Sequence, residues 1–146
     1  MLQPNIDYVI CTDAAFVDSK SPQKMGKGVC VSTKNYFFYL PLQTVGTYPL
    51  LQTFKNHQYF QGVSVLEGIQ KLVDSAQSVE DLEDSLMAVL EENPRNVHHI
   101  PSYKTFNVGG LFAKNLFRVS QHRFNYYACL VKPKATAAEF RTFHGI

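Results

Sequence analysis

Tryptophan is absent from the 146 residues, and charged residues make up only 18% of them. So low a charged share beside 45% hydrophobic residues argues against intrinsic disorder. No stretch reaches the 18 or more apolar residues needed to cross a bilayer, so we expect a soluble, unsecreted protein. A formal net charge of only +2 indicates neither an all-over basic nucleic-acid binder nor an acidic solvating chain.

Cysteine is scarce, and its spacing is uninformative. Cys11, Cys30 and Cys129 are odd in number and unpaired in spacing, which disfavours a disulfide framework and favours a reducing, cytoplasmic setting. Each lies in an apolar alternating run, where a cysteine usually behaves as a small buried hydrophobe. The sequence therefore predicts no catalytic cysteine.

Motifs for metal, cofactor and hydrolase chemistry are also missing. There is no HExxH, GxSxG or CxxC pattern, no P-loop and no dinucleotide fingerprint. His98 and His99 are adjacent on an extended segment, so their side chains point to opposite sides and cannot easily share a metal ion. We predict no metal, no cofactor and no catalytic residue. Asp13 interrupts an apolar strand, where a lone acid usually protects a sheet edge.

Alternation with a period of two predicts strands near both ends of the chain. Residues 34 and 35 read as a hairpin turn, and Pro41 as an edge or an end of a strand. Residues 19–28 read as a loop, and residues 43–62 as an extended connection with a short strand at 50–54. The main predicted strands are 6–17, 29–33, 36–40, 103–108, 111–119 and 124–131.

The period changes to that of a helix in the middle of the chain. Ser64 with Glu67 and Ser78 with Asp81 have the spacing of capping boxes, and apolar residues follow each at helical spacing. Two abutting helices are therefore predicted within 64–93. A third such spacing, Thr136 with Glu139, predicts a terminal helix over 136–144 that plugs one end of the sheet.

These elements predict a single α+β domain over residues 1–146. We expect a mostly antiparallel sheet, or a partly open barrel, of about six strands. Its parts are a β-rich segment at 6–42, the helix pair at 64–93, a second β-rich segment at 102–132 and the terminal helix at 136–144.

Charge is split along the chain. Residues 61–93 hold eight acids and one lysine, whereas residues 94–146 hold eight bases and one glutamate, which gives −7 against +7. The simpler interpretation is that these charges solvate helix faces and strand edges. The alternative is electrostatic complementarity, either within the chain, with a second copy, or with an anionic partner.

Lysines gather around the first predicted loop. Lys20, Lys24 and Lys27 lie in it and Lys34 lies at the next turn, so these four are the candidate residues for binding an anionic group. The simpler interpretation is that these lysines only make the hairpin soluble. Neighbouring aromatics at 36–39 suggest base stacking, but a strand divides them between two faces, so nucleic acid remains disfavoured.

The two ends of the chain resemble PH-like and GRAM-like domains. The first part of this likeness is the hairpin over 28–39, GVCVSTKNYFFY. The second is the closing LVKPK at 130–134 with a helix over 137–143. The resemblance implies a partly open barrel that binds phosphoinositide head groups or protein segments, with Lys24 and Lys27 in the first inter-strand loop. The strand after this loop lacks the basic pair of phosphoinositide-binding members, which leaves protein binding as the equal alternative.

The leading functional hypothesis is a non-enzymatic binding or interaction domain, with a protein partner or self-association. One alternative is a small enzyme or ligand carrier with an aromatic-lined cavity, in which Asp13, Cys11 and a histidine converge. Another is attachment to anionic membranes through Lys20, Lys24 and Lys27. A cleft that joins Asp13 to a histidine would favour the enzyme, and a filled core would favour the binding domain.

Overall fold

The computed structural model describes residues 1–18, 21–46, 65–92, 98–109, 113–122, 125–132 and 134–146. The predicted short strand at 50–54 and the predicted helix cap Ser64 lie outside these ranges. The strands are β1 (Tyr8–Asp18), β2 (Ser21–Thr33), β3 (Tyr36–Gly46), β4 (His98–Pro101), β5 (Lys104–Gly109), β6 (Ala113–His122) and β7 (Asn125–Lys132). The helices are α2 (Val65–Ser75), α3 (Val79–Glu92) and α4 (Lys134–His144).

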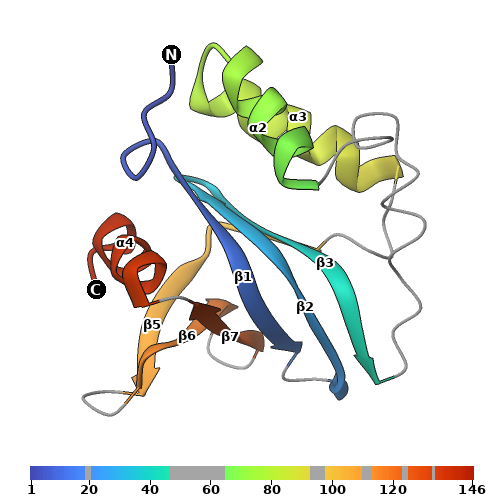
Figure 1. Ribbon diagram of the computed structural model, residues 1–146, viewed down its shortest axis with the longest axis vertical. Coiled ribbons are helices and arrows are strands. Elements are labelled where there is room, and N and C mark those ends of the chain that lie inside the picture. The colour runs from blue at the N-terminus through green and yellow to red at the C-terminus, as the bar shows by residue number, and fades with distance from the viewer. Residues whose placement is uncertain (19–20, 47–64, 93–97, 110–112, 123–124, 133) are drawn as a thin grey trace.

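The strands form one antiparallel sheet in the order β4-β3-β2-β1-β7-β6-β5, which curls into a partly open barrel (Figure 1). β1 joins the two halves because it pairs with β2 along most of its length and with β7 through Asp13–Asp18. The predicted α+β class and curled antiparallel sheet are confirmed. We expected about six strands, and the described residues contain seven.

Residues 29–31 of β2 and 37–39 of β3 are covered on both faces, as their apolar sequence pattern requires. Val29 and Val31 pack with α2 and α3 on one face, whereas Cys30 between them packs into the barrel interior. On β3, Phe38 packs on the same face as the two valines, and Phe37 and Tyr39 pack on the same face as Cys30. Adjacent strand residues point to opposite faces, so an unbroken apolar run supplies two cores at once.

The helix pair is confirmed and lies between β3 and β4 in the chain. The Asp81 main-chain N–H donates to Ser78 Oγ at 3.0 Å, and Asp81 Oδ2 accepts the Gln77 N–H at 3.0 Å, so the second capping signal is present. Ile69 and Leu82 are fully buried against the sheet. Burying each such side chain contributes roughly 1.5–3 kcal/mol.

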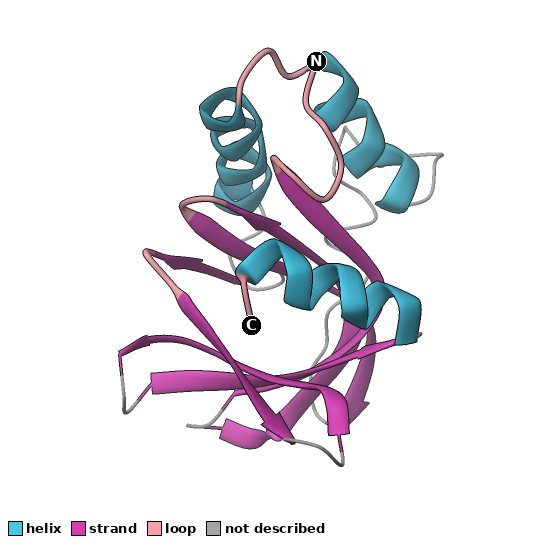
Figure 2. Ribbon diagram, turned by 90° about the vertical axis from the view of Figure 1, so that its left-hand side faces the viewer, coloured by secondary structure: helices cyan, strands magenta, loops and turns pink. Residues whose placement is uncertain are grey.

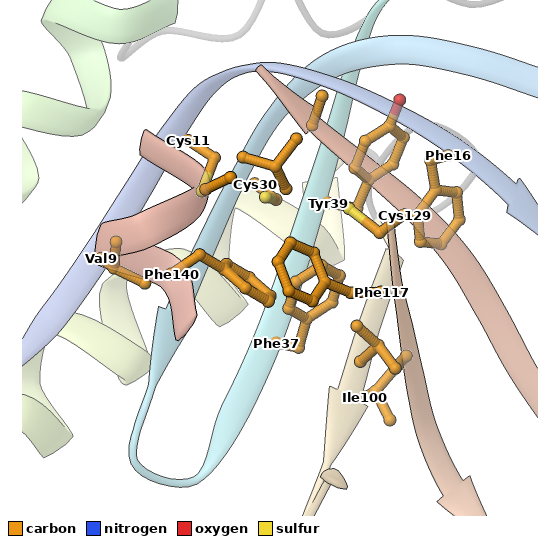
Figure 3. Close-up of a cluster of buried hydrophobic side chains, with 14 residues drawn as sticks. Val9, Cys11, Phe16, Cys30, Phe37, Tyr39, Ile100, Phe117, Cys129 and Phe140 are labelled. Carbon is orange, nitrogen blue, oxygen red and sulfur yellow. The ribbon is translucent and has the colours of Figure 1, made fainter. Parts of the chain in front are cut away.

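α4 closes one end of the barrel, as predicted (Figure 2). Ala137 and Phe140 are buried in the interior, where the Phe140 ring lies 4.5 Å from the Phe117 ring (Figure 3). The helix begins at Lys134 rather than at residue 136, so Thr136 lies inside the first turn and is not its cap. None of the helices in the described ranges is long and apolar enough to cross a membrane.

Tertiary pairing corrects two local predictions. β2 begins at Ser21, so Lys24 and Lys27 lie on a strand and not in a loop. Its glycine-rich half is flanked on both sides, since Gly26 is opposite Phe16 of β1 and Thr44 of β3. Main-chain bonds to two neighbours outweigh the turn-forming composition.

β4 was also missed, because a four-residue strand carries almost no periodic signal. His98 and His99, which the sequence analysis placed on an extended segment, lie on this strand and pair with β3. β3 continues through Pro41, which is opposite Gly28 of β2. Among the described residues, β4 pairs with residues 36–39 of β3, and Pro41 lies inside β3 and not at the strand's end.

A buried carboxylate fastens the helix pair to the sheet. Glu83 of α3 is only 3% exposed and reaches the β2–β3 turn. Its Oε2 accepts the Thr33 hydroxyl at 2.5 Å and the Asn35 main-chain N–H at 3.1 Å, and its Oε1 accepts the Asn35 side-chain amide at 3.0 Å. The Thr33 hydroxyl also accepts the Tyr36 N–H at 3.2 Å. Glu83 is therefore a structural clamp, whereas its sequence context suggested a solvating charge.

We expect Glu83→Ala to lower the free energy of unfolding by about 2–4 kcal/mol, because it leaves three donors without their charged acceptor. Urea unfolding followed by circular dichroism measures this loss. The matched control is Asp84→Ala, the exposed neighbouring acid on the same helix, for which we expect less than about 0.5 kcal/mol. Equal losses in the two variants would contradict the clamp.

Candidate functional site

An open pocket of about 570 Å³ lies where the β2–β3 turn, the β4–β5 corner and the end of α4 meet. Chain segments distant in the sequence supply its wall, including the N-terminal turn and the start of α3. The corner itself is strained: Ser102 has a φ of 50°, and its N–H donates to the Asn35 carbonyl at 2.9 Å. The lining residues are Ile6, Asp7, Thr33, Lys34, Val79, Tyr103, Lys104, Thr105, Phe106, Phe143 and His144.

Tyr103 ties the corner to the hairpin. Its hydroxyl lies 2.7 Å from the Thr33 carbonyl oxygen and 3.1 Å from His144 Nε2. Burial raises the pKa of Tyr103 well above its ordinary value, so the phenol keeps its proton. Because Thr33 also binds Glu83, the pocket connects through one residue to the helix pair.

His144 closes the pocket from the end of α4. Its Nδ1 lies 2.7 Å from the Phe140 carbonyl oxygen, and its ring centroid lies 4.1 Å from that of Phe140. Burial lowers the pKa of His144 from 6.5 to about 4, although the bond to Phe140 acts in the other direction. The imidazole is therefore neutral near pH 7, with its proton on Nδ1.

The charged residues of the pocket favour an anion. Lys34 and Lys104 are exposed and line it together with a single acid, Asp7. Asp7 Oδ2 accepts the Gln3 main-chain N–H at 2.7 Å, so part of its hydrogen-bonding capacity is used within the N-terminal turn. Two lysines and one aspartate give the lining a net charge of +1 at neutral pH.

The pocket continues along β5, which lies at one end of the sheet order. Within the described residues, β5 pairs with β6 on one side and has no strand on the other. Phe106 and Val108 on this strand are 50% and 57% exposed. Lys104 is exposed on the same face, two residues before Phe106. Large apolar side chains left in water on an edge strand favour an added partner.

The predicted lysines separate into two places. Lys34 lines the pocket. Lys24 lies near the start of β2 and Lys27 lies at its middle, whereas Lys34 follows its last residue. Lys20 lies outside the described residues. Anion binding by Lys20, Lys24 and Lys27 remains a prediction.

Asp13, Cys11 and a histidine do not meet in the pocket. Asp13 is exposed on β1 opposite Lys132 of β7, and Cys11 is fully buried in the core. The histidine that lines the pocket is His144, which the sequence analysis did not single out. Among the described residues, no group of three or more His, Cys, Asp or Glu side chains is arranged to hold a metal ion.

The three cysteines are buried, as predicted, and they also converge (Figure 3). Cys30 is directly opposite Cys11 in the β1–β2 register. Hydrogen bonding of Cys30 to Cys11 and then to Cys129, followed by burial, raises its pKa well above the ordinary value. All three thiols are therefore part of the core. Their convergence depends on the curl of the sheet, so no spacing in the sequence could reveal it.

Comparisons with protein-family models, with curated proteins and with solved structures found no match. The resemblance to PH-like and GRAM-like domains thus remains a hypothesis. It rests on the segments at 28–39 and 130–143.

Neutral burial of His144 makes the fold sensitive to acid. Its folded pKa of about 4 is below the unfolded value of 6.5, so the unfolded chain binds the proton more readily between these values. Stability is therefore lost as the pH falls from about 6.5 to about 4, by at most about 3 kcal/mol.

We expect His144→Gln to remove that part of the acid sensitivity, as measured by urea unfolding at pH 7 and pH 4.5. The matched control is His99→Gln, because His99 of β4 does not line the pocket. This variant should keep the wild-type change in the free energy of unfolding between pH 7 and pH 4.5. A slope unchanged by His144→Gln would show that this imidazole is not buried in its neutral form.

Proposed function

We propose that this protein is a non-enzymatic interaction domain that binds an extended, acidic segment of a partner protein along β5 and in the adjoining pocket. The observation that carries the proposal is an edge strand with an exposed lysine and two exposed apolar side chains, Lys104, Phe106 and Val108, on one face. The pocket with Lys34 lies at the lysine end of that strand.

The two strands at the ends of the described sheet differ in how well they resist an added strand. β4 is four residues long and ends in Pro101, whose nitrogen has no hydrogen to donate, so it is a poor template. β5 has six residues, no proline and only one charged side chain. A partner strand added to β5 would gain main-chain hydrogen bonds and would cover apolar surface.

Side-chain pairing specifies the pattern of the partner. Residues directly opposite each other on antiparallel strands share a face. The partner should therefore present apolar side chains opposite Val108 and Phe106, and a carboxylate opposite Lys104. Read from its N-terminus, the partner has the pattern apolar-x-apolar-x-acidic, and its acidic residue reaches the pocket.

A second copy of the chain satisfies this pattern less well. β5 reads KTFNVG and contains no acid, so pairing β5 with itself brings no carboxylate to Lys104. The acidic helices α2 and α3 pack on the face of β1–β3, and the α3 residue that lines the pocket beside β5 is the apolar Val79 (Figure 1). Charge complementarity therefore favours a different protein over self-association.

The packing of the aromatic residues supports binding at the surface over an internal ligand. Phe117 and Phe140 are fully buried and in ring contact, and Phe16 stacks on Tyr39 at 4.0 Å. Because these rings fill the core, the interior of the barrel is occupied by side chains where an internal ligand would have to bind. The PH-like resemblance, with its partly open barrel and closing helix, agrees with protein binding. The membrane alternative rests on Lys20, Lys24 and Lys27 alone.

A synthetic nine-residue peptide with a central Val-Thr-Phe-Thr-Glu segment tests the proposal by isothermal titration calorimetry. We expect it to bind, and we expect replacement of its Glu by Lys to weaken binding at least tenfold, which is about 1.4 kcal/mol. In the protein, Phe106→Glu should weaken binding to a similar or greater degree, because it places a carboxylate where an apolar side chain should pack.

The matched control is Lys114→Gln, compared with Lys104→Gln. Both lysines are exposed, but Lys114 follows Ala113, which is opposite Gly109 at the far end of β5. Only Lys104→Gln should weaken the peptide. Equal affinity of the wild type and the Phe106→Glu variant would exclude β5 as the site, and a concentration-dependent dimer abolished by Phe106→Glu would favour self-pairing instead.

A further inference from the structure

At the base of the pocket, the single hydroxyl proton of Tyr103 faces two acceptors. His144 Nδ1 faces a carbonyl, the Phe140 oxygen, so this nitrogen must carry the proton of the neutral ring. Nε2 is then an acceptor. Tyr103 has a single hydroxyl proton but lies within reach of two acceptors, the Thr33 carbonyl at 2.7 Å and Nε2 at 3.1 Å.

While His144 is neutral, Tyr103 can donate to only one of these two acceptors at a time. If Tyr103 donates to the closer Thr33 carbonyl, its oxygen and Nε2 face each other with lone pairs. If it donates to Nε2, the Thr33 carbonyl loses the proton of Tyr103. An unsatisfied acceptor in a largely buried position costs about 1–3 kcal/mol.

A proton on Nε2 allows both contacts of the Tyr103 hydroxyl to be hydrogen bonds at the same time. The imidazolium of His144 then donates from Nδ1 to Phe140 and from Nε2 to the Tyr103 oxygen, while Tyr103 donates to Thr33. Burial away from water disfavours the charged imidazolium and so keeps this proton off Nε2 when no anion is bound. A negative charge in the same pocket would offset that cost.

We propose that the pocket is an oxyanion site whose occupation is coupled to the uptake of one proton by His144, an inference that rests on the proposed function. The ligand group is the carboxylate of the partner segment, or an inorganic oxyanion of the same chemistry. Lys34 and Lys104 attract it from the rim, and the imidazolium supplies a third positive charge at the base. The proton moves from solvent to Nε2, and no covalent bond to the ligand forms.

The surrounding charges are compatible with this coupling. Arg141, on the same helix as His144, donates to the main-chain carbonyl of Lys114. Asp7 opposes the anion but favours the imidazolium, and the two lysines do the reverse. Two further titratable groups, Cys30 and Glu83, act on Tyr103.

Sulfate is the first probe, because it keeps its charge between pH 4 and pH 8. The resonances of His144, assigned by comparison with His144→Gln, are followed by NMR across this range with and without sulfate at constant ionic strength. We expect the pKa of His144 to rise from about 4 toward about 6. Linkage then makes sulfate bind about tenfold more tightly at pH 5 than at pH 7.

Tyr103→Phe removes the oxygen that accepts the Nε2 proton, and we expect it to reduce the tenfold ratio to less than threefold. His144→Gln should abolish the pH dependence and leave the attraction of the lysines. An unchanged pKa of His144 at saturating sulfate, or the absence of sulfate binding at pH 5, would overturn the proposal. The wild-type titration decides this even if a variant fails to fold.

The acidic peptide distinguishes this inference from the proposed function. Peptides with Glu or Gln at the position opposite Lys104 are compared at pH 5 and pH 7. Tighter binding of the Glu peptide alone at pH 5 supports the carboxylate as ligand. Peptide binding without pH dependence rejects the proton coupling and keeps the interaction domain. A response to sulfate without peptide binding rejects the interaction domain and keeps the oxyanion site.

Discussion

The carboxylate of Glu83 is the contact on which the arrangement of this molecule depends. It is buried and charged, and that is tolerable only because the hydroxyl of Thr33 and two N–H groups of Asn35 surround it. These bonds hold the β2–β3 turn against α3. The Thr33 carbonyl then accepts Tyr103, and Tyr103 contacts His144. A single hairpin turn therefore joins the helix pair, the β4–β5 corner and the terminal helix.

The sheet carries this arrangement because its first half is buried on both faces. Helices on one side and the barrel interior on the other bury alternate residues of β1–β3. The second half is different: β5 forms an edge and leaves Phe106 and Val108 in water. The two halves of the sheet thus differ in how much apolar surface they bury, and the pocket lies where they meet.

Local patterns predicted much of the fold. The helix pair followed from Ser78 with Asp81 and from apolar residues at helical spacing, because both signals act within one or two turns. Alternation predicted most strands. The missed β4 and the missed first half of β2 are short or glycine-rich segments, whose strand geometry is imposed by neighbours. For the site, Lys34 was singled out, but Tyr103, Lys104 and His144 were not.

Residue type and short-range period were enough to predict the class of fold, the burial of the cysteines and the split of charge. Which of the charges make structural contacts depends on how the chain folds. Glu83 and the exposed Asp84 are neighbours in one acidic helix, yet only one reaches a turn 48 residues away. The pocket likewise joins residues 33, 103 and 144, and contacts across such distances depend on the curl of the sheet and not on any local pattern.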